Sequence, residues 1–316
     1  MTKLVISIVT WNSSNSIKEC VESVLRQGFK EYSLFIVDNA SMDNTLSIVS
    51  TIKDERIQII SLKENTGFCG GHNYVLNHSQ SDFVLLVNPD IILSPNYVEL
   101  ALQTMQNNNK IGTVCGLLLQ SPKEDPQCTI DSAGLNIMPS RIMSLNHHGE
   151  KLFEAKLKTE EVFGADGALP LYRREMINNV SINGQFFDNM FFAHKEDWDV
   201  SWRSAIYGWK TIFNPMCVAI HPRVFKPGNL KLRKNMPKQI KIDAVKNQLI
   251  LLAKNESAKE FFTHFLKIVP RQIIIFFYIL FFENSSLKAY SFFFKNRKQI
   301  FISRKIIQQN RKVSTI

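Results

Sequence analysis

The stretch 82-DFVLLVNPDIIL-93 places a continuous apolar run directly before Asn88-Pro89-Asp90. An unbroken run of mostly branched aliphatic residues is typical of a strand that is buried on both faces. Pro89 has no backbone N–H to give to a sheet, so the strand is expected to end here and to leave Asp90 at its carboxyl end. An aspartate at that place is either a turn residue or part of a binding site.

Similar apolar runs recur along the first 120 residues, with helical patterns between them. Strands are predicted at 4–9, 33–38, 56–61, 83–88 and 111–117. Segment 16–27 is typical of an amphipathic helix, because its apolar residues recur at helical spacing. This alternation predicts an α/β fold, in which helices flank a mostly parallel sheet.

The second half of the chain is less regular. Residues 121–160 are polar and weakly patterned, and 162-VFGADGALPLYRREM-176 predicts a strand, a turn and a helix. The segment 194-HKEDWDVSWRSAIYGWK-210 predicts a helix with acidic residues in its first turn and Gly208 as its end. A basic loop is predicted directly after Pro222, and a further helix at 237–255.

Charge is unevenly distributed over the 316 residues. Residues 222–316 hold 20 Lys and Arg against 4 Asp and Glu, whereas the first 221 residues hold 18 against 24. The basic part also carries the aromatic clusters 275-IFFYILFF-282 and 292-FFF-294. Basic residues interleaved with bulky apolar ones favour an anionic membrane surface over a nucleic acid. Residues 256–316 are therefore predicted to be a membrane-associating helical tail, with a homodimer interface as the alternative use.

The most apolar run of the tail, 272–282, is 11 residues long. A helix that spans a membrane needs about 20 apolar residues, so this one is expected to lie in the membrane interface. The five cysteines form no C-x-x-C pair, and the N-terminus lacks the apolar core of a signal peptide. These features predict a cytoplasmic protein, peripherally associated with the inner face of the cell membrane.

Four segments converge on one edge of the predicted sheet, because ligands of open α/β sheets bind at the carboxyl ends of the strands. They are 5-VISIVTWNSS-14, 36-IVDNASMDNT-45, the glycine-rich 64-ENTGFCGGHN-73, and Asn88-Pro89-Asp90 itself. Taken singly, each has another explanation: Asp38 and Asp43 can cap a helix, and the glycines can serve turns. Their joint occurrence in this order predicts a ligand site.

These segments, with 162-VFGADGALPLYRREM-176 and 191-FFAHKEDWDVSWR-203, resemble the motifs of the inverting glycosyltransferases of family 2, which have the GT-A fold. The nearest branch is the bacterial rhamnosyltransferase-like one, which builds surface polysaccharide. The resemblance covers about residues 3–255. It implies a domain over 1–255, in which 1–120 bind the nucleotide sugar and 121–255 bind the acceptor.

The resemblance also implies roles for individual residues. Donor contacts are expected from Thr10, Asn12, Asp38, Asn65, Gly67, Gly71, Asn73, Asn88 and Asp90. Asp90 and His221 would hold a divalent cation, Mg²⁺ or Mn²⁺, whose oxygen preference suits a carboxylate. The family commonly has Asp-x-Asp where this chain has Asn88, Pro89 and Asp90, so one carboxylate is left instead of two.

An inverting transfer needs a general base to take the proton of the acceptor hydroxyl. Asp197 is predicted to be that base, with Glu196 as the second candidate. Asp199 lies four residues before Arg203, which predicts a salt bridge along the helix. Asp166 and Trp198 are expected to contact the acceptor, although Asp166 between two glycines is also typical of a turn.

The sequence thus predicts an inverting glycosyltransferase with dTDP-L-rhamnose as donor and a polyprenyl-diphosphate-linked saccharide as acceptor. A catalytically inactive GT-A module that binds nucleotide or lipid is the first alternative. A dinucleotide-binding oxidoreductase is disfavoured, because 10-TWNSSN-15 offers no glycine after the first strand. A nucleic-acid binder is disfavoured by the phenylalanines of the tail.

Overall fold

The computed structural model describes residues 2–222 and 230–314, so the basic loop expected directly after Pro222 lies outside the described residues. A ten-stranded sheet with the order β10-β12-β6-β11-β4-β1-β2-β3 forms the centre of the described chain, with β5 paired to β12 and β7 paired to β6. The strands of this sheet are β1 (Thr2–Thr10), β2 (Tyr32–Asp38), β3 (Ile57–Ser61), β4 (Ser81–Val87), β5 (Ile92–Leu93), β6 (Ile111–Leu119), β7 (Ile130–Ser132), β10 (Glu160–Val162), β11 (Leu171–Arg173) and β12 (Lys210–Ile220). A separate two-stranded sheet pairs β8 (Leu135–Ile137) with β9 (Met143–Leu145).

The direction of the strands confirms the predicted fold class. Strand β1 lies between β2 and β4 and runs parallel to both, and β2 runs parallel to β3. Strand β11 lies antiparallel between β4 and β6, and β12 runs parallel to β6. All five strands predicted in the first 120 residues are present, with ends shifted by two residues or fewer.

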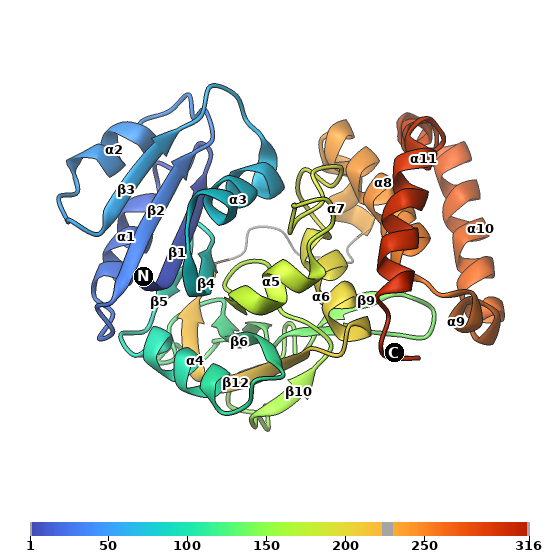
Figure 1. Ribbon diagram of the computed structural model, residues 1–316. Helices are drawn as coiled ribbons and strands as arrows, with labels where there is room; N and C mark the ends of the chain where they lie inside the picture. The colour runs from blue at the N-terminus through green and yellow to red at the C-terminus, as the bar shows by residue number, and fades with distance from the viewer. Residues whose placement is uncertain (1, 223–229, 315–316) are drawn as a thin grey trace.

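Helices cover both faces of the sheet (Figure 1). They are α1 (Ile17–Leu25), α2 (Thr45–Thr51), α3 (Gly67–His78), α4 (Tyr97–Gln106), α5 (Arg174–Val180), α6 (Glu196–Ile206), α7 (Leu230–Asn235), α8 (Lys238–Asn255), α9 (Ala258–Thr263), α10 (Phe265–Phe282) and α11 (Lys288–Gln309), with a 3₁₀ turn at Asn284–Leu287. The helix predicted within 194–210 begins only at Glu196, because Phe192, His194 and Lys195 have positive φ angles that a helix does not allow.

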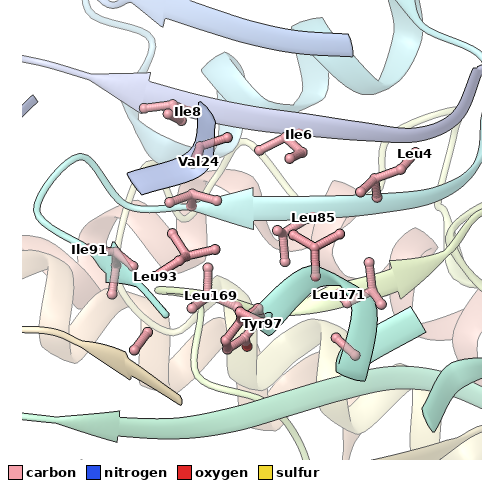
Figure 2. Packing of buried hydrophobic residues seen from close by; sticks show 14 of the residues in the cluster. Leu4, Ile6, Ile8, Val24, Leu85, Ile91, Leu93, Tyr97, Leu169 and Leu171 are labelled. Carbon is pink, nitrogen blue, oxygen red and sulfur yellow. Dashed lines mark hydrogen bonds between the residues drawn. The ribbon is translucent and has the colours of Figure 1, made fainter. Parts of the chain in front are cut away.

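Strand β1 shows why the sheet is buried on both faces. Leu4, Ile6 and Ile8 belong to the core on the side of α1 and α4, where they meet Val24 and Tyr97 (Figure 2). The residues between them point the other way, and Val5 joins a second core, formed with α3, α5, α6, α8 and α11. The period of two along a strand therefore supplies apolar contacts to both layers.

The tail predicted at 256–316 divides into two different parts. Ile300 and Ile307 of α11 are fully buried in the same core as Ile250 and Leu251 of α8, and α11 packs along α8. Burying an aliphatic side chain stabilises a fold by about 1.5–3 kcal/mol, so α11 is held to the main body. In Figure 1, α9, α10 and α11 stand at the end of the molecule opposite to α1, α2 and α3. The proposed domain boundary at residue 255 stays a prediction.

Helix α10 is the exposed part of the tail. Its 18 residues have a mean hydropathy of 1.9 and only 11% of them are buried, which makes it, among the described helices, the one long and apolar enough to cross a membrane. The helix is longer than the apolar run 272–282 suggested, because it begins at Phe265 and passes through Pro270. Its length is about 27 Å at 1.5 Å per residue, close to the roughly 30 Å of a hydrocarbon core.

Candidate active site

One cavity of about 590 Å³ collects seven of the residues that the sequence singled out. These residues come from four separate parts of the chain and include both candidate metal ligands and both candidate bases: Asn88, Asp90, Asp166, Glu196, Asp197, Trp198 and His221. The cavity lies beyond the carboxyl ends of β4 and β12. The structure therefore brings the donor-side and acceptor-side predictions into one space.

Strand pairing places Asp90 beside His221. Strand β5 runs antiparallel to β12, and Ile92 pairs with Ile220, so the residues just before β5 and just after β12 are neighbours. His221 Nε2 lies 3.6 Å from an Asp90 carboxylate oxygen. Asp90 keeps about 37% of its side chain exposed, whereas His221 is buried.

The other ring nitrogen of His221 is held by Asp131, which was not among the predicted site residues. His221 Nδ1 lies 2.8 Å from Asp131 Oδ2, and Asp131 is fully buried on β7. A proton on Nδ1, donated to that carboxylate, leaves the Nε2 lone pair directed toward Asp90. No local motif marks Asp131, because its meeting with His221 depends on contacts across 90 residues.

The two candidate bases begin α6 and face the loop that follows β10. The Gly167 N–H donates to Asp197 Oδ2 at 3.1 Å, which orients this carboxyl group. Burial, together with the neighbouring charge of Asp197, raises the pKa of Glu196 well above its ordinary value. Glu196 therefore retains its proton to a higher pH than an ordinary glutamate does.

Asp166 serves the turn that its sequence suggested and also lines the cavity. Its Oδ1 accepts the Ala168 N–H at 2.8 Å, and the Ala168 carbonyl accepts the Asn88 N–H at 2.8 Å. The loop 166–168 thus connects the residue before the Pro89-Asp90 turn with the start of α6. Trp198 lies partly exposed at the edge of the same cavity.

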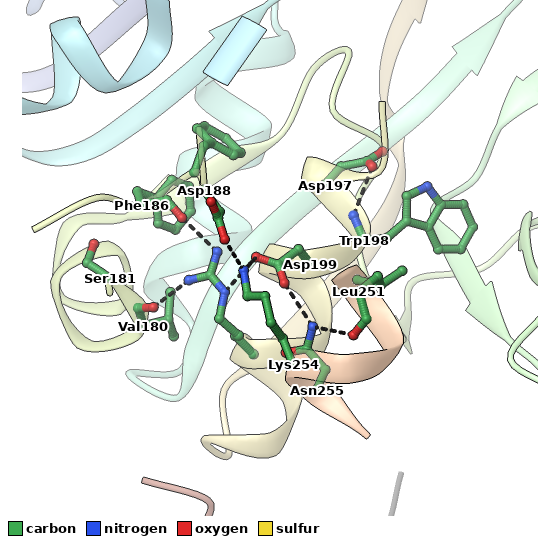
Figure 3. Close-up of polar contacts among 12 residues, drawn as sticks. Val180, Ser181, Phe186, Asp188, Asp197, Trp198, Asp199, Leu251, Lys254 and Asn255 are labelled. Carbon is green, nitrogen blue, oxygen red and sulfur yellow. Dashed lines mark hydrogen bonds and ion pairs between the residues drawn. The ribbon is translucent and has the colours of Figure 1, made fainter. Parts of the chain in front are cut away.

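A buried network of charged side chains anchors α6 to α8 and to the loop before α6 (Figure 3). The predicted salt bridge is confirmed, with Asp199 Oδ2 at 3.0 Å from Arg203 Nε. Lys254 Nζ lies 3.2 Å from the same Asp199 and 2.6 Å from Asp188. Burial of Asp199 acts to raise its pKa, but the Lys254 and Arg203 cations outweigh this effect and lower it.

The ends of β1 and β2 present two buried oxygen atoms side by side. Thr10 pairs with Asp38 in the strand register. Thr10 Oγ1 and Asp38 Oδ1 are buried, and neither has a hydrogen-bond partner among residues 2–222 and 230–314. Buried polar atoms are nearly always bonded, so such a pair suits the hydroxyl or N–H donors of a ligand.

The loops after β1 and β2 are bound to each other and to the glycine-rich segment. Asn12 Oδ1 accepts the Met42 N–H at 2.8 Å. Asn39, missed although it is next to Asp38, accepts from Thr66 N–H at 2.8 Å and donates to the Gly67 carbonyl. Asn65 Oδ1 accepts the Gly67 N–H at 2.8 Å. These side chains build the shape of the loop, and their contact with a donor stays a prediction.

The remaining residues of the glycine-rich segment connect α3 to its surroundings. A Cβ on Gly71 would lie 2.6 Å from Val9, so this glycine lets α3 approach β1. His72 is buried against Ser7, at 2.8 Å, and burial lowers its pKa to about 3. The Asn73 side chain bonds to both the N–H and the carbonyl of Phe187. His72, which had no predicted role, is thus a neutral packing residue.

Three further polar side chains line the cavity and were not singled out from the sequence. Lys195 Nζ donates to Gln248 Oε1 at 2.6 Å, and Arg271 of α10 faces the same space. Two weak signals existed: Lys195 directly precedes the acidic pair, and Arg271 borders the apolar run of the tail. Which cavity a basic residue enters is set by the packing of α6, α8 and α10.

The comparisons with known proteins agree with this geometry. The family described as glycosyl transferase family 2 matches residues 5–181, which is more than half of the chain. The chain belongs to glycosyltransferase family 2. The match includes the β1, β2 and β4 strand ends and the glycine-rich segment, but ends before α6.

Two relatives in sequence are themselves named as glycosyltransferases. The Escherichia coli UDP-Glc:alpha-D-GlcNAc-diphosphoundecaprenol beta-1,3-glucosyltransferase WfgD is 28% identical over 111 residues, which cover 34% of this chain and 44% of that protein. The putative teichuronic acid biosynthesis glycosyltransferase TuaG of Bacillus subtilis is 28% identical over 128 residues, which cover 39% of this chain and 51% of that protein. The chain thus matches about half of the length of these relatives.

A solved structure with the same fold is the mannosyltransferase PcManGT of Pyrobaculum calidifontis, in complex with GDP-Man and Mn²⁺. It superposes with a TM-score of 0.55 at 15% identity, covering 94% of this chain and 75% of that one. At this identity the likeness establishes the fold of the family 2 enzyme, which is GT-A-like.

Proposed function

We propose that this family 2 glycosyltransferase moves a sugar from a nucleotide diphospho-sugar to a hydroxyl of a lipid-linked saccharide, with inversion at the anomeric carbon. The observation that carries the proposal is the single cavity in which Asp90 and His221 meet Glu196 and Asp197. A group that favours a leaving diphosphate and a group that removes a proton are the two things this reaction requires.

The donor nucleoside is assigned to the ends of β1 and β2. Asp38 Oδ1 and Thr10 Oγ1 offer buried acceptor atoms there, and a base or ribose brings the matching donors. Asn12, Asn65, Gly67, Gly71 and Asn73 keep the surrounding loops in place. Asn88 and Asp90 are assigned to the ribose and diphosphate side, where β4 ends.

A divalent cation fits between Asp90 and His221 for a chemical reason. When its Nδ1–H donates to Asp131, His221 turns a lone pair toward the Asp90 carboxylate oxygen 3.6 Å away, and these two residues would hold the cation. Mg²⁺ or Mn²⁺ suits one carboxylate and one imidazole when donor phosphates and water complete the coordination. When bound, such an ion stabilises the charge of the departing nucleoside diphosphate.

Asp197 is proposed as the general base. Its carboxylate accepts the proton of the acceptor hydroxyl as that oxygen bonds to the anomeric carbon and the bond to the diphosphate breaks. The Gly167 N–H orients Asp197, whereas the raised pKa of Glu196 keeps that side chain protonated to higher pH and so makes it the weaker candidate for the base. Trp198 and Asp166 are assigned to the acceptor sugar, since both line the cavity next to Asp197.

The acceptor and the location are proposed from two further observations. One relative acts, by its name, on a saccharide linked to a diphosphoundecaprenol lipid. This chain also exposes apolar side chains along α10, among them Phe277, Phe281 and Phe282. We propose that α10 meets the inner face of an anionic membrane and that the acceptor is polyprenyl-diphosphate-linked. L-rhamnose from dTDP-L-rhamnose remains the first proposed donor, by resemblance of the motifs.

Calorimetric binding of a panel of nucleotide sugars, with and without Mn²⁺, tests the donor site. The panel contains dTDP-L-rhamnose, UDP-glucose and GDP-mannose, and the proteins are wild type, Asp90→Asn and Asp82→Asn. Asp82 is an exposed carboxylate at the opposite end of β4, which makes it a matched control. We expect metal-dependent binding of one donor, lost in Asp90→Asn and kept in Asp82→Asn.

Absence of nucleotide binding by the wild type under every condition would refute the proposed function. Binding without any transfer to a lipid-linked saccharide would instead favour the inactive GT-A module. That alternative has one observation behind it, the Asn88 that replaces the first aspartate of the family pattern.

A further inference from the structure

The side of the active-site cavity that faces the tail is built from two cations and an amide. Lys195 precedes the first turn of α6, Gln248 lies on α8 and Arg271 lies on α10. Lys195 Nζ donates to Gln248 Oε1 at 2.6 Å, which directs the Gln248 amide nitrogen elsewhere. None of these three residues is used by the donor site or by the general base.

Neither cation has an anionic partner in the described part of the chain. No carboxylate among residues 2–222 and 230–314 lies within ion-pair distance of Lys195 or Arg271, and Gln248 Nε2 and Arg271 Nη1 are buried atoms without a hydrogen-bond partner there. Elsewhere the protein does compensate such groups: Lys254 pairs with Asp188 and Asp199, and Arg233 pairs with Glu283 at 2.6 Å.

The electrostatic consequence is that two cations line this side of the cavity without a direct ion pair to any carboxylate of residues 2–222 and 230–314. Burial, with the charges of Arg271 and Arg233, lowers the pKa of Lys195 to about 7, although the more weakly acting charge of Asp197 opposes this shift. Burial also lowers the pKa of Arg271. Leaving cations desolvated and unpaired is unfavourable, and an anion that enters the cavity removes the penalty. Phosphate groups are commonly bound by arginine and lysine side chains that line the same cavity.

We propose that Lys195, Gln248 and Arg271 form a subsite that binds the diphosphate of the lipid-linked acceptor. This inference rests on the proposed transferase function and assigns the part of the cavity that recognises the lipid end of the acceptor. Arg271 donates to two phosphate oxygens, Lys195 supplies a second positive charge, and the Gln248 amide donates a further hydrogen bond.

Three features favour the acceptor diphosphate over the donor diphosphate. The donor diphosphate is assigned to Asp90 and His221, at the ends of β4 and β12. Lys195 instead adjoins the proposed base, which must reach the acceptor hydroxyl. Arg271 is carried by α10, where the apolar side chains that follow it, such as Ile274 and Phe277, are exposed. A lipid diphosphate likewise has a charged group followed by an apolar chain, so its diphosphate could meet Arg271 while its chain follows the apolar side chains of α10.

The test is binding of a short-chain prenyl diphosphate, in detergent micelles, to the full-length protein. Wild type is compared with Arg271→Gln, Lys195→Gln and Lys267→Gln, and the corresponding prenol is the uncharged ligand. Lys267 is an exposed cation on the same helix and does not line the cavity, so its variant removes a charge without removing the subsite. Arg271→Lys keeps the charge and checks that the helix tolerates substitution.

We expect the affinity for the prenyl diphosphate to fall about tenfold or more in Arg271→Gln and in Lys195→Gln, to be largely restored in Arg271→Lys and to be unchanged in Lys267→Gln. Binding of the nucleoside diphosphate in the presence of Mn²⁺ should be the same in all variants with wild-type thermal stability.

Equal affinities of wild type and Arg271→Gln for the prenyl diphosphate, or for prenyl diphosphate and prenol, would overturn the subsite. Loss of nucleoside diphosphate binding in Arg271→Gln would overturn it too, since the cations would then serve the donor. Failure of the proposed function looks different, because the wild type would bind no nucleotide at all.

Discussion

At the scale of single residues, the proposed base Asp197 and its neighbour Glu196 are expected to contribute differently to catalysis. Asp197→Asn is expected to lower kcat by about 10²- to 10⁴-fold, because the amide cannot act as the general base for the acceptor hydroxyl. Glu196→Gln should cost less, since Glu196 holds its proton to higher pH. Steady-state rates and donor affinity, measured on both variants, check this. An Asp197→Asn enzyme with a wild-type rate would exclude Asp197 as the base.

His72 makes stability depend on pH. The unfolded histidine binds a proton below about pH 6.5, whereas the folded one resists it until about pH 3. Stability is therefore fully present above the unfolded value and is lost as the pH falls, by up to about 1.4 kcal/mol per pH unit from this group.

Urea unfolding between pH 7 and pH 4.5 tests this sign. In His72→Asn the fall in the free energy of unfolding should be smaller than in wild type by about 2–3 kcal/mol at pH 4.5. His78→Asn is the matched control, since His78 is exposed on the same helix. If the free energy of unfolding fell equally with pH in wild type and in His72→Asn, His72 would not be the source of the pH dependence.

At the scale of elements, the position of α6 depends on the buried network below it. Asp199→Asn leaves Lys254 and Arg203 partly uncompensated in the interior, which is expected to cost about 3–5 kcal/mol of stability. The same substitution should lower activity, because Asp197 is carried on that helix.

The exposed pair Glu22–Arg26 offers a control with the same spacing. Its charges lie 3.8 Å apart with about half of each side chain exposed, so Glu22→Gln should change stability by less than about 1 kcal/mol. Thermal or urea unfolding of both variants gives the comparison. Equal effects of the two substitutions would mean that the buried network does not hold α6.

At the scale of the whole molecule, the exposed face of α10 and the basic charge of residues 222–316 predict binding to anionic membranes. Flotation with vesicles of anionic phospholipid should carry the protein upward more than vesicles of neutral phospholipid do, and added salt should weaken the effect. The double variant Phe277→Ser/Phe281→Ser should reduce binding about tenfold or more, since each phenylalanine loses apolar burial.

Phe153→Ser is the control for that experiment. Phe153 is 71% exposed and precedes α6 in the sequence, so it is not part of the tail helices. A similar loss in Phe153→Ser, or equal flotation with neutral vesicles, would argue against a docking face on α10. The exposed face of α10 would then be better explained as a homodimer interface, and sedimentation would detect the dimer.

Local patterns predicted much of the fold, and the reason is visible in particular elements. Strands such as β1 and β4 are apolar on both sides because each contributes to two cores, and that requirement is written into consecutive residues. The stop at Pro89 was likewise a local matter. The start of α6 could not be predicted locally, because nothing in 192-FAHK-195 signals the positive φ angles that precede the helix.

The sequence alone determined the α/β alternation, the polar strand ends, the acidic pair at 196–197 and the charge of the tail, because each is a property of neighbouring residues. Only the tertiary structure decided that Asp131 holds His221, that Asn39 and Asn73 build loops, and that α11 belongs to the core while α10 does not. It also decided that Lys195 and Arg271 share a cavity with Asp197, the proposed base. The physical reason is that these contacts join residues far apart in the chain, and their free energy comes from burial and charge pairing that exist only once the layers have packed.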